Sequence, residues 1–85
     1  MAYSVLLKSS AEKSLKKQPR PAQVRLIEAI NKLGANPRPP GVTKLQGDGN
    51  LWRICVGPYR VVYEIHDDKL IVLVVRIGDR KDIYR

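Results

Sequence analysis

The sequence predicts an α+β fold in which an N-terminal strand and a two-helix hairpin pack on one face of a small, mainly antiparallel sheet. Three observations carry this prediction: a short strand pattern begins the chain, two helical segments follow it, and three strand patterns come after them. Helices that precede a run of strands, rather than alternating with them, are typical of α+β folds. At 85 residues the chain is too short for two cores, so we expect residues 1–85 to form a single domain.

The first part of the chain reads as one strand and two helices. Residues 3 to 8, YSVLLK, have the character of a short strand. Ser9 and Glu12 have the S-x-x-E spacing of a capping box, which predicts a helix that begins at Ser9. Two prolines end that helix, and the second of them, Pro21, suits the first turn of the next helix. We expect this second helix to end at Gly34.

The second part of the chain reads as a loop and an antiparallel meander. Residues 36 to 49 hold three of the six prolines and three of the six glycines, which predicts a loop. Three strands are expected next, joined by tight turns at 57–58 and 67–69 and spanning about 50–56, 59–66 and 70–77.

Alternation along these strands sorts their side chains onto two faces. The apolar sets are expected to face the helices; they are Trp52, Ile54 and Val56, then Val61, Tyr63 and Ile65, then Ile71, Leu73, Val75 and Ile77. On the opposite, uncovered face the same alternation places Arg53, Arg60 and Arg76. Three like charges on one small face repel each other, so stability alone does not call for them, and we interpret them as a surface for phosphates. A solvated face with scattered arginines is the alternative.

Composition bounds the class of partner. The chain has 16 Lys and Arg against 8 Asp and Glu, a net charge of +8 and a pI near 10, which favours RNA, DNA or an acidic protein over the alternative of a merely basic protein. A single cysteine excludes an intrachain disulfide and favours a reducing cytoplasm. One Cys and one His do not make a zinc site, so neither metal nor cofactor is expected. No apolar run is long enough to cross a membrane.

Arginine, lysine and tyrosine remain as chemistry-bearing residues, and this set can cleave RNA without a metal. The substrate's 2′-hydroxyl attacks the adjacent phosphate, while planar guanidinium groups stabilise the charge that builds on the phosphate oxygens. Tyr84 can stack on a base or donate a proton. We interpret His66 as a strand-end residue and Cys55 as a small strand residue rather than as catalysts.

Several motifs together resemble a known family. They are K-L-x-G at 44–47, W-R-I at 52–54, G-x-Y-R-V-x-Y at 57–63 and the ending G-x-R-x-D-x-Y at 78–84. In their order and spacing the chain resembles the RelE/ParE superfamily of bacterial and archaeal toxins, on the RelE side. The resemblance implies a cytoplasmic endoribonuclease that cleaves mRNA in the ribosomal A site, contacts rRNA there, and is neutralised by a cognate antitoxin.

The resemblance also implies which residues act. It assigns the reaction to Arg53, Arg60, Arg80 and Tyr84, and Lys44 matches the lysine of the K-L-x-G motif. We expect Lys44, Arg76 and Lys81 to help hold RNA.

Two residues depart from the family pattern. Cys55 stands where many relatives carry a second basic residue, and Asp79 replaces a His or Lys that is common before the arginine. Two alternatives stay open. The family fold also permits a ParE-like poison of DNA gyrase. Cys55 and Asp79 favour an inactive binding module that keeps antitoxin and operator-complex roles.

Overall fold

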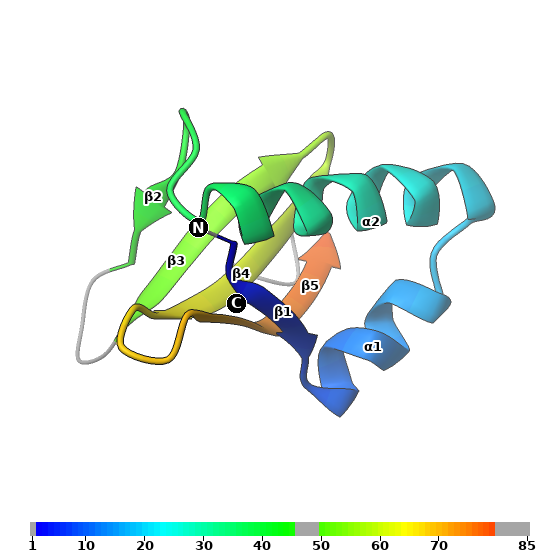
Figure 1. Ribbon diagram of the computed structural model, residues 1–85. Helices are drawn as coiled ribbons and strands as arrows, with labels where there is room; N and C mark the ends of the chain where they lie inside the picture. The colour runs from blue at the N-terminus through cyan, green and yellow to red at the C-terminus, as the bar shows by residue number, and fades with distance from the viewer. Residues whose placement is uncertain (1, 46–49, 80–85) are drawn as a thin grey trace.

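The computed structural model describes residues 2–45 and 50–79 of the chain. In chain order its elements are β1 (Ser4–Leu7), α1 (Ser9–Lys16), α2 (Arg20–Ala35), β2 (Thr43–Lys44), β3 (Leu51–Val56), β4 (Tyr59–His66) and β5 (Ile71–Asp79). Figure 1 shows α2 lying in front of the sheet and α1 beside the end of β1. Neither described helix combines the length and the apolar character that crossing a membrane requires.

The five strands form a single sheet in the order β1-β5-β4-β3-β2. β1 runs parallel to β5, and every other neighbouring pair is antiparallel. The α+β class and the mainly antiparallel sheet are therefore confirmed, with the N-terminal strand at one edge of the sheet. β2, only two residues long, was not predicted.

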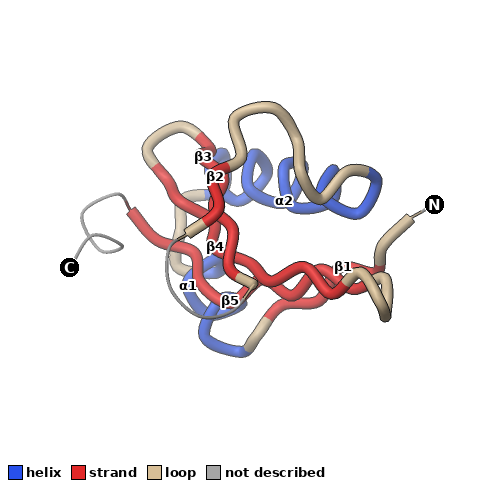
Figure 2. The backbone as a smooth tube through the Cα atoms, turned by 90° about the vertical axis from the view of Figure 1, so that its left-hand side faces the viewer, coloured by secondary structure: helices blue, strands red, loops and turns tan. Residues whose placement is uncertain are grey.

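One hydrophobic core fills the space between the helices and one face of the sheet, and Figure 2 shows α2 along one side of the twisted strands. The spacing of the apolar residues in α2 turns one stripe of the helix inward. The core side chains are Ala11 of α1, Leu26, Ile30 and Leu33 of α2, and Ile54, Val61, Tyr63, Ile65, Val72, Val74 and Ile77 of the strands. The other face of the sheet carries no described helix, and we call it the open face.

α1 begins at Ser9, as predicted, but the predicted capping box does not form. Lys8 is the N-cap, no side-chain bond caps the helix, and Ser9 is already helical. The reason is the sheet: the Lys8 backbone N–H donates to Val74 O at 2.9 Å, so the strand ladder continues to the first residue of the helix.

The predicted helix end at Gly34 is also wrong, because α2 continues to Ala35. Gly34 lies inside the helix where β1 crosses it closely, and its carbonyl accepts a bond from the Tyr3 N–H at 2.7 Å. A Cβ at this position would lie 3.1 Å from Tyr3 O and 3.3 Å from Val5 Cγ2. The glycine therefore serves close packing rather than a left-handed helix end.

The predicted faces of β5 are correct only beyond a β-bulge. Val62 pairs with Arg76 and Tyr63 pairs with Val74, so Val75 has no partner across the β4–β5 ladder. Before the bulge, each side chain of β5 faces the side opposite to the predicted one. Val72 and Val74 are fully buried against the helices. Ile71 and Leu73, expected in the core, lie on the open face opposite His66 and Glu64.

The loop after α2 is held by hydrogen bonds to Asp67, in the turn between β4 and β5. Two nitrogens of Arg38 donate to the Asp67 carboxylate, at 3.2 and 2.9 Å, and the Tyr3 hydroxyl donates to the same carboxylate at 2.5 Å. These hydrogen bonds lower the pKa of Asp67 to about 2, and those from Arg38 have the largest effect. The buried Tyr63 hydroxyl adds a 2.6 Å bond to Pro37 O. This end of the molecule is thus tied by side chains from three separate segments.

Candidate nucleic-acid interface

The open face carries the three predicted arginines together. Arg53 of β3 lies opposite Val62 of β4, which in turn lies opposite Arg76 of β5. Residues that pair across a ladder share a face, so Arg53 and Arg76 flank Val62 in one row across the sheet. Because neighbouring strands are about 4.8 Å apart, the backbones of this row span about 10 Å.

Arg60 belongs to the next row along β4. It lies between Cys55 of β3 and Gly78 of β5, so neither of its cross-strand partners has a large side chain. Its Nη1 donates to its neighbour Tyr59 O at 3.3 Å. Its Nε is buried and has no hydrogen-bond partner among the described residues. A buried donor of this kind gains most from an incoming acceptor, and a phosphate oxygen is a strong one.

The three arginines differ in exposure. Arg53 and Arg60 are half-buried, whereas Arg76 is exposed. Val62 is 6 % exposed beneath the row, so the guanidinium stems stand on an apolar floor. Arg53 and Arg60 are therefore partly enclosed by their neighbours on the sheet, whereas Arg76 extends into solvent.

The other half of the open face has a different character. His66 Nε2 and Glu64 Oε1 lie 2.8 Å apart, and both side chains are half-buried. Glu64 lies between Leu51 and Leu73 in the register. His66 thus has a carboxylate partner that the sequence interpretation did not assign to it.

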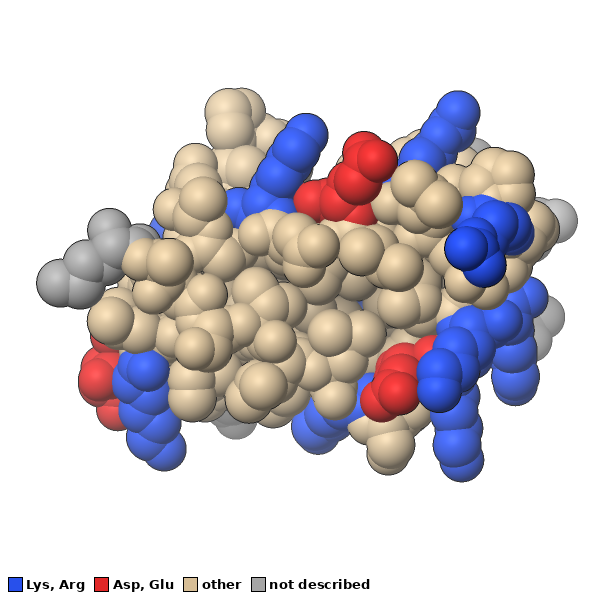
Figure 3. Space-filling view, turned by 45° about the vertical axis from the view of Figure 1, so that its right-hand side comes forward, with Lys and Arg blue, Asp and Glu red and all other residues tan. Residues whose placement is uncertain are grey.

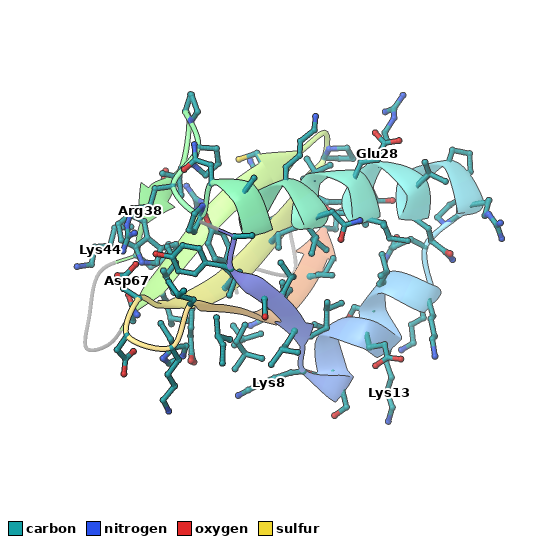
Figure 4. The ribbon with its side chains drawn as sticks, in the orientation of Figure 1. Lys8, Lys13, Glu28, Arg38, Lys44 and Asp67 are labelled. Atoms are coloured by element: carbon teal, nitrogen blue, oxygen red, sulfur yellow. The ribbon has the colours of Figure 1, made fainter. Side chains whose placement is uncertain are left out.

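Lys44 lies apart from the arginines. Its register partner is Trp52, and Trp52 pairs with the buried Tyr63, so this row belongs to the helix-bearing face. The Lys44 Nζ lies 5.6 Å from the centre of the Trp52 ring, and Arg38 Cζ lies 4.9 Å from it. Figure 4 shows Lys44, Arg38 and Asp67 at the same end of the molecule. Thr43, not Lys44, is the residue opposite Arg53.

Three predicted site residues, Arg80, Lys81 and Tyr84, lie outside the described residues, so their roles stay predictions. Of the two departures from the family pattern, Cys55 is exposed on the open face directly opposite Arg60. Asp79 is exposed at the end of β5, opposite Tyr59.

Sequence reasoning missed one basic residue near this face. Lys8 continues the β1 ladder through its bond to Val74 O, and alternation from the exposed Leu6 carries its side chain toward the open side. Figure 4 shows Lys8 where β1 meets α1. The signal was present in the sequence, because Lys8 ends the strand pattern two positions after Leu6.

Positive charge also extends beyond the open face. In the view of Figure 3, Lys and Arg side chains gather around the periphery while the centre is uncharged. No group of three or more His, Cys, Asp and Glu side chains that could hold a metal is found within residues 2–45 and 50–79. Around Arg60 the described residues offer guanidinium groups, a thiol and the backbone, and the His66–Glu64 pair lies on the other half of the open face.

Comparison with known proteins agrees with this architecture. The profile of a family described as "ParE toxin of type II toxin-antitoxin system, parDE" matches residues 5–84. A protein of Escherichia coli described as a RelE-like toxin is 31% identical over 88 residues, covering 99% of this chain and 92% of the relative.

Two solved structures extend the comparison to three dimensions. The archaeal RelE–RelB complex from Pyrococcus horikoshii contains a chain that is 28% identical, with a TM-score of 0.83 and coverage of 94% of this chain and 97% of that one. The intact E. coli RelBE toxin–antitoxin complex contains a chain that is 26% identical, with a TM-score of 0.80 and coverage of 92% and 96%. The protein therefore belongs to the RelE/ParE superfamily and is a RelE-like toxin of a type II toxin–antitoxin system.

Proposed function

We propose that this toxin is a ribosome-dependent endoribonuclease that cleaves mRNA in the decoding site. The observation that supports this best is the open face, where Arg53, Arg60 and Arg76 gather without a covering helix among the described residues. Such a face suits a flexible, single-stranded polyanion better than a folded protein surface, because guanidinium groups pair with successive phosphates.

The proposed reaction uses the substrate's own nucleophile. The 2′-hydroxyl attacks the adjacent phosphorus, the bond to the 5′-oxygen breaks, and a cyclic phosphate and a 5′-hydroxyl result. Arg53 and Arg60 would stabilise the additional negative charge on the non-bridging oxygens as it develops. Arg80 would join them, and Tyr84 would stack on a base or assist proton transfer. Arg76 and Lys81 would hold flanking RNA, whereas Lys44, which lies beside Trp52 on the helix-bearing face, has no place in this contact.

The ribosome has a physical role in this scheme. The His66–Glu64 pair lies on the other half of the open face, at least four residues along β4 from Arg60. With that pair so far from Arg60, the rate would depend on how well the 2′-hydroxyl is aligned with the scissile bond. The A site would supply that alignment by holding the message. The site of action would then be the cytoplasm.

An antitoxin is the second partner that we propose. The Pyrococcus and E. coli chains were solved in complexes with RelB. The net charge of +8 favours an acidic or otherwise charge-complementary partner here. By covering the open face, such a partner would block access of RNA to Arg53 and Arg60.

A second candidate function is poisoning of DNA gyrase, because the matching family profile is named for ParE. This function requires a protein-binding surface and not a phosphate-binding one. A third candidate is a weakened toxin that acts mainly through antitoxin binding, and Cys55 and Asp79 favour it.

One experiment separates these candidates. Controlled expression would be followed by primer extension on two copies of one message, one translated and one with its start codon removed. We expect cleavage within seconds to minutes, confined to the translated copy. DNA-damage signalling without mRNA cleavage would instead support gyrase poisoning, and neither response at full expression would support the binding module.

A further inference from the structure

A cavity of about 390 Å³ lies between α1 and the outer edge of β5. The cavity lies outside the row formed by Arg53, Val62 and Arg76, although Arg76 also belongs to its lining. Its lining consists of Ser10, Ser14, Val75, Arg76, Ile77 and Gly78.

The cavity exists because β1 is shorter than β5. The parallel pairing ends at Leu7 with Val74, and the chain then turns into α1. From Val75 onward the outer edge of β5 therefore has no described strand beside it. Backbone N–H and C=O groups at such an edge lack ladder partners. The β-bulge at Val75 lies at the same point and bends the strand.

The helix turns hydroxyl groups toward this edge. Ser10 and Ser14 are four residues apart and so lie one above the other on the same flank of α1. The Ser10 hydroxyl reaches Val75 O only at 3.4 Å, which is a long hydrogen bond that a better acceptor would replace. Ser14 is half-buried, so its hydroxyl is held at the wall of the cavity.

The charge of the lining selects the ligand. The lining residues supply two hydroxyl donors, edge backbone groups and the Arg76 guanidinium, and no carboxylate is among them. Hydroxyl donors beside a planar guanidinium match the oxygens of a phosphate group.

Arg76 connects this cavity to the open face. The row formed by Arg53, Val62 and Arg76 runs across the strands and ends at β5, and the cavity lies on the outer side of that strand. A nucleotide backbone that crosses the sheet from Arg53 to Arg76 would reach Ser10 and Ser14 next. We propose that the cavity between α1 and β5 is a second phosphate site, and that it holds the RNA backbone where the RNA leaves the arginine face. The RNA part rests on the proposed function, whereas phosphate binding by the cavity does not.

Charge-matched variants provide the sharpest test. Ser14→Asp places a carboxylate at the cavity wall, while Ser9→Asp places one on an exposed residue of the same helix outside the lining. Both changes lower the net charge by one, so they affect long-range attraction to RNA alike. The probe is a fluorescent single-stranded RNA with 2′-O-methyl groups, which cannot be cleaved. We expect Ser14→Asp to weaken binding roughly tenfold more than Ser9→Asp. Equal losses would overturn the proposal.

A milder pair of variants covers the case in which Ser14→Asp does not fold. The double change Ser10→Ala with Ser14→Ala removes both hydroxyls, and Ser9→Ala is the control. We expect binding of the same RNA to weaken about threefold to tenfold in the double variant only. Unchanged affinity of the folded double variant contradicts the site. A loss of affinity for an acidic antitoxin, with RNA binding unchanged, would assign the cavity to a protein partner and overturn its assignment to RNA.

Titration with inorganic phosphate, followed through backbone amide NMR shifts, tests the cavity without RNA. We expect shifts at residues 10–14 and 76–78 that disappear in the double variant. Shifts confined to the strands of Arg53 and Arg60 would overturn the second phosphate site. If the wild type fails to cleave translated message, the proposed function is wrong, yet the phosphate titration still decides whether the cavity binds phosphate.

Discussion

Cys55 and Arg60 lie directly opposite each other across the β3–β4 ladder, on the face of the sheet that no described helix covers. Cross-strand partners have Cβ atoms about 5 Å apart, so the exposed thiol and the guanidinium stem are neighbours. The position of Cys55 therefore decides what else can contact a phosphate bound to Arg60.

The first prediction follows from this pair. Replacing Cys55 by Lys or Arg would add a positive group beside the scissile phosphate, and we expect cleavage of translated message to rise by roughly tenfold or more, because one positioned acid, base or phosphate contact contributes about 10²–10⁴-fold. Cys55→Ser keeps the size of the side chain without adding charge and serves as the control. A Cys55→Lys rate no higher than that of the wild type would mean that the thiol does not weaken the site.

The second prediction concerns Arg60 itself. We expect Arg60→Ala to lower the cleavage rate by about 10²–10³-fold, as the loss of one transition-state donor does elsewhere. Growth inhibition would disappear with it. Arg20→Ala removes an exposed arginine at the start of α2 and makes the same change in net charge, so it should remain toxic. Full toxicity of Arg60→Ala at equal expression would remove Arg60 from the site. We expect Arg80→Ala to behave like Arg60→Ala.

The third prediction concerns the Asp67 carboxylate. Its pKa is lowered to about 2 by the hydrogen bonds from Arg38 and Tyr3. A carboxyl whose pKa is lower in the folded state than in the unfolded chain stabilises the fold above its ordinary pKa, and that stability is lost as the pH falls toward the lowered value. We therefore expect thermal unfolding of the wild type to shift downward between about pH 4 and pH 2.

Two variants identify the group responsible. Asp67→Asn should melt a few degrees below the wild type at pH 7 and show a smaller shift between pH 4 and pH 2. Asp68→Asn changes the next, exposed carboxylate of the same turn and should keep the wild-type profile. Identical profiles for the wild type and Asp67→Asn would show that these hydrogen bonds do not stabilise the fold.

The fourth prediction concerns Gly34. Alanine is favoured over glycine in a helix by about 1 kcal/mol, but overpacking costs about 1–3 kcal/mol. A new Cβ would press on Tyr3 O at 3.1 Å and on Val5 Cγ2 at 3.3 Å. We expect Gly34→Ala to lower the free energy of unfolding by about 1 kcal/mol in urea denaturation. The comparison of Asn31→Gly with Asn31→Ala, at an exposed interior position of the same helix, reports helix propensity alone. A Gly34→Ala protein more stable than the wild type would show that the backbone around β1 shifts to accept the new methyl group at little cost.

Local patterns predicted much of this fold, because they depend on neighbouring residues. Gly57 in the turn at 57–58 has the positive φ of 59° that favours glycine, and the turn joins two antiparallel strands, as predicted. Long-range contacts could not be predicted in the same way. The ladder bond from Lys8 to Val74 replaced the expected capping box, and the crossing of β1 explains Gly34 better than a helix end does.

The candidate site was predictable to a similar extent. Strict alternation placed Arg53 and Arg60 correctly, since β3 and β4 pair without interruption. It also placed Arg76 correctly but reversed Val72 and Val74, because a bulge depends on packing that a single strand's sequence does not reveal. The position of Lys44 opposite Trp52 could not be predicted, because it depends on β2, a two-residue strand that is too short to produce a periodic pattern.

The unpaired Val75 separates two halves of β5 that obey opposite phases. Because the extra residue is taken up at the bulge, the strand from Arg76 onward keeps its own alternation. Removing Val75 would leave Arg76 opposite Val62 and Ile77 opposite Val61, as they are now. A deletion at this point would therefore keep the guanidinium group of Arg76 on its present face, which offers protein engineers a place to vary the curvature of the sheet while keeping its charge pattern.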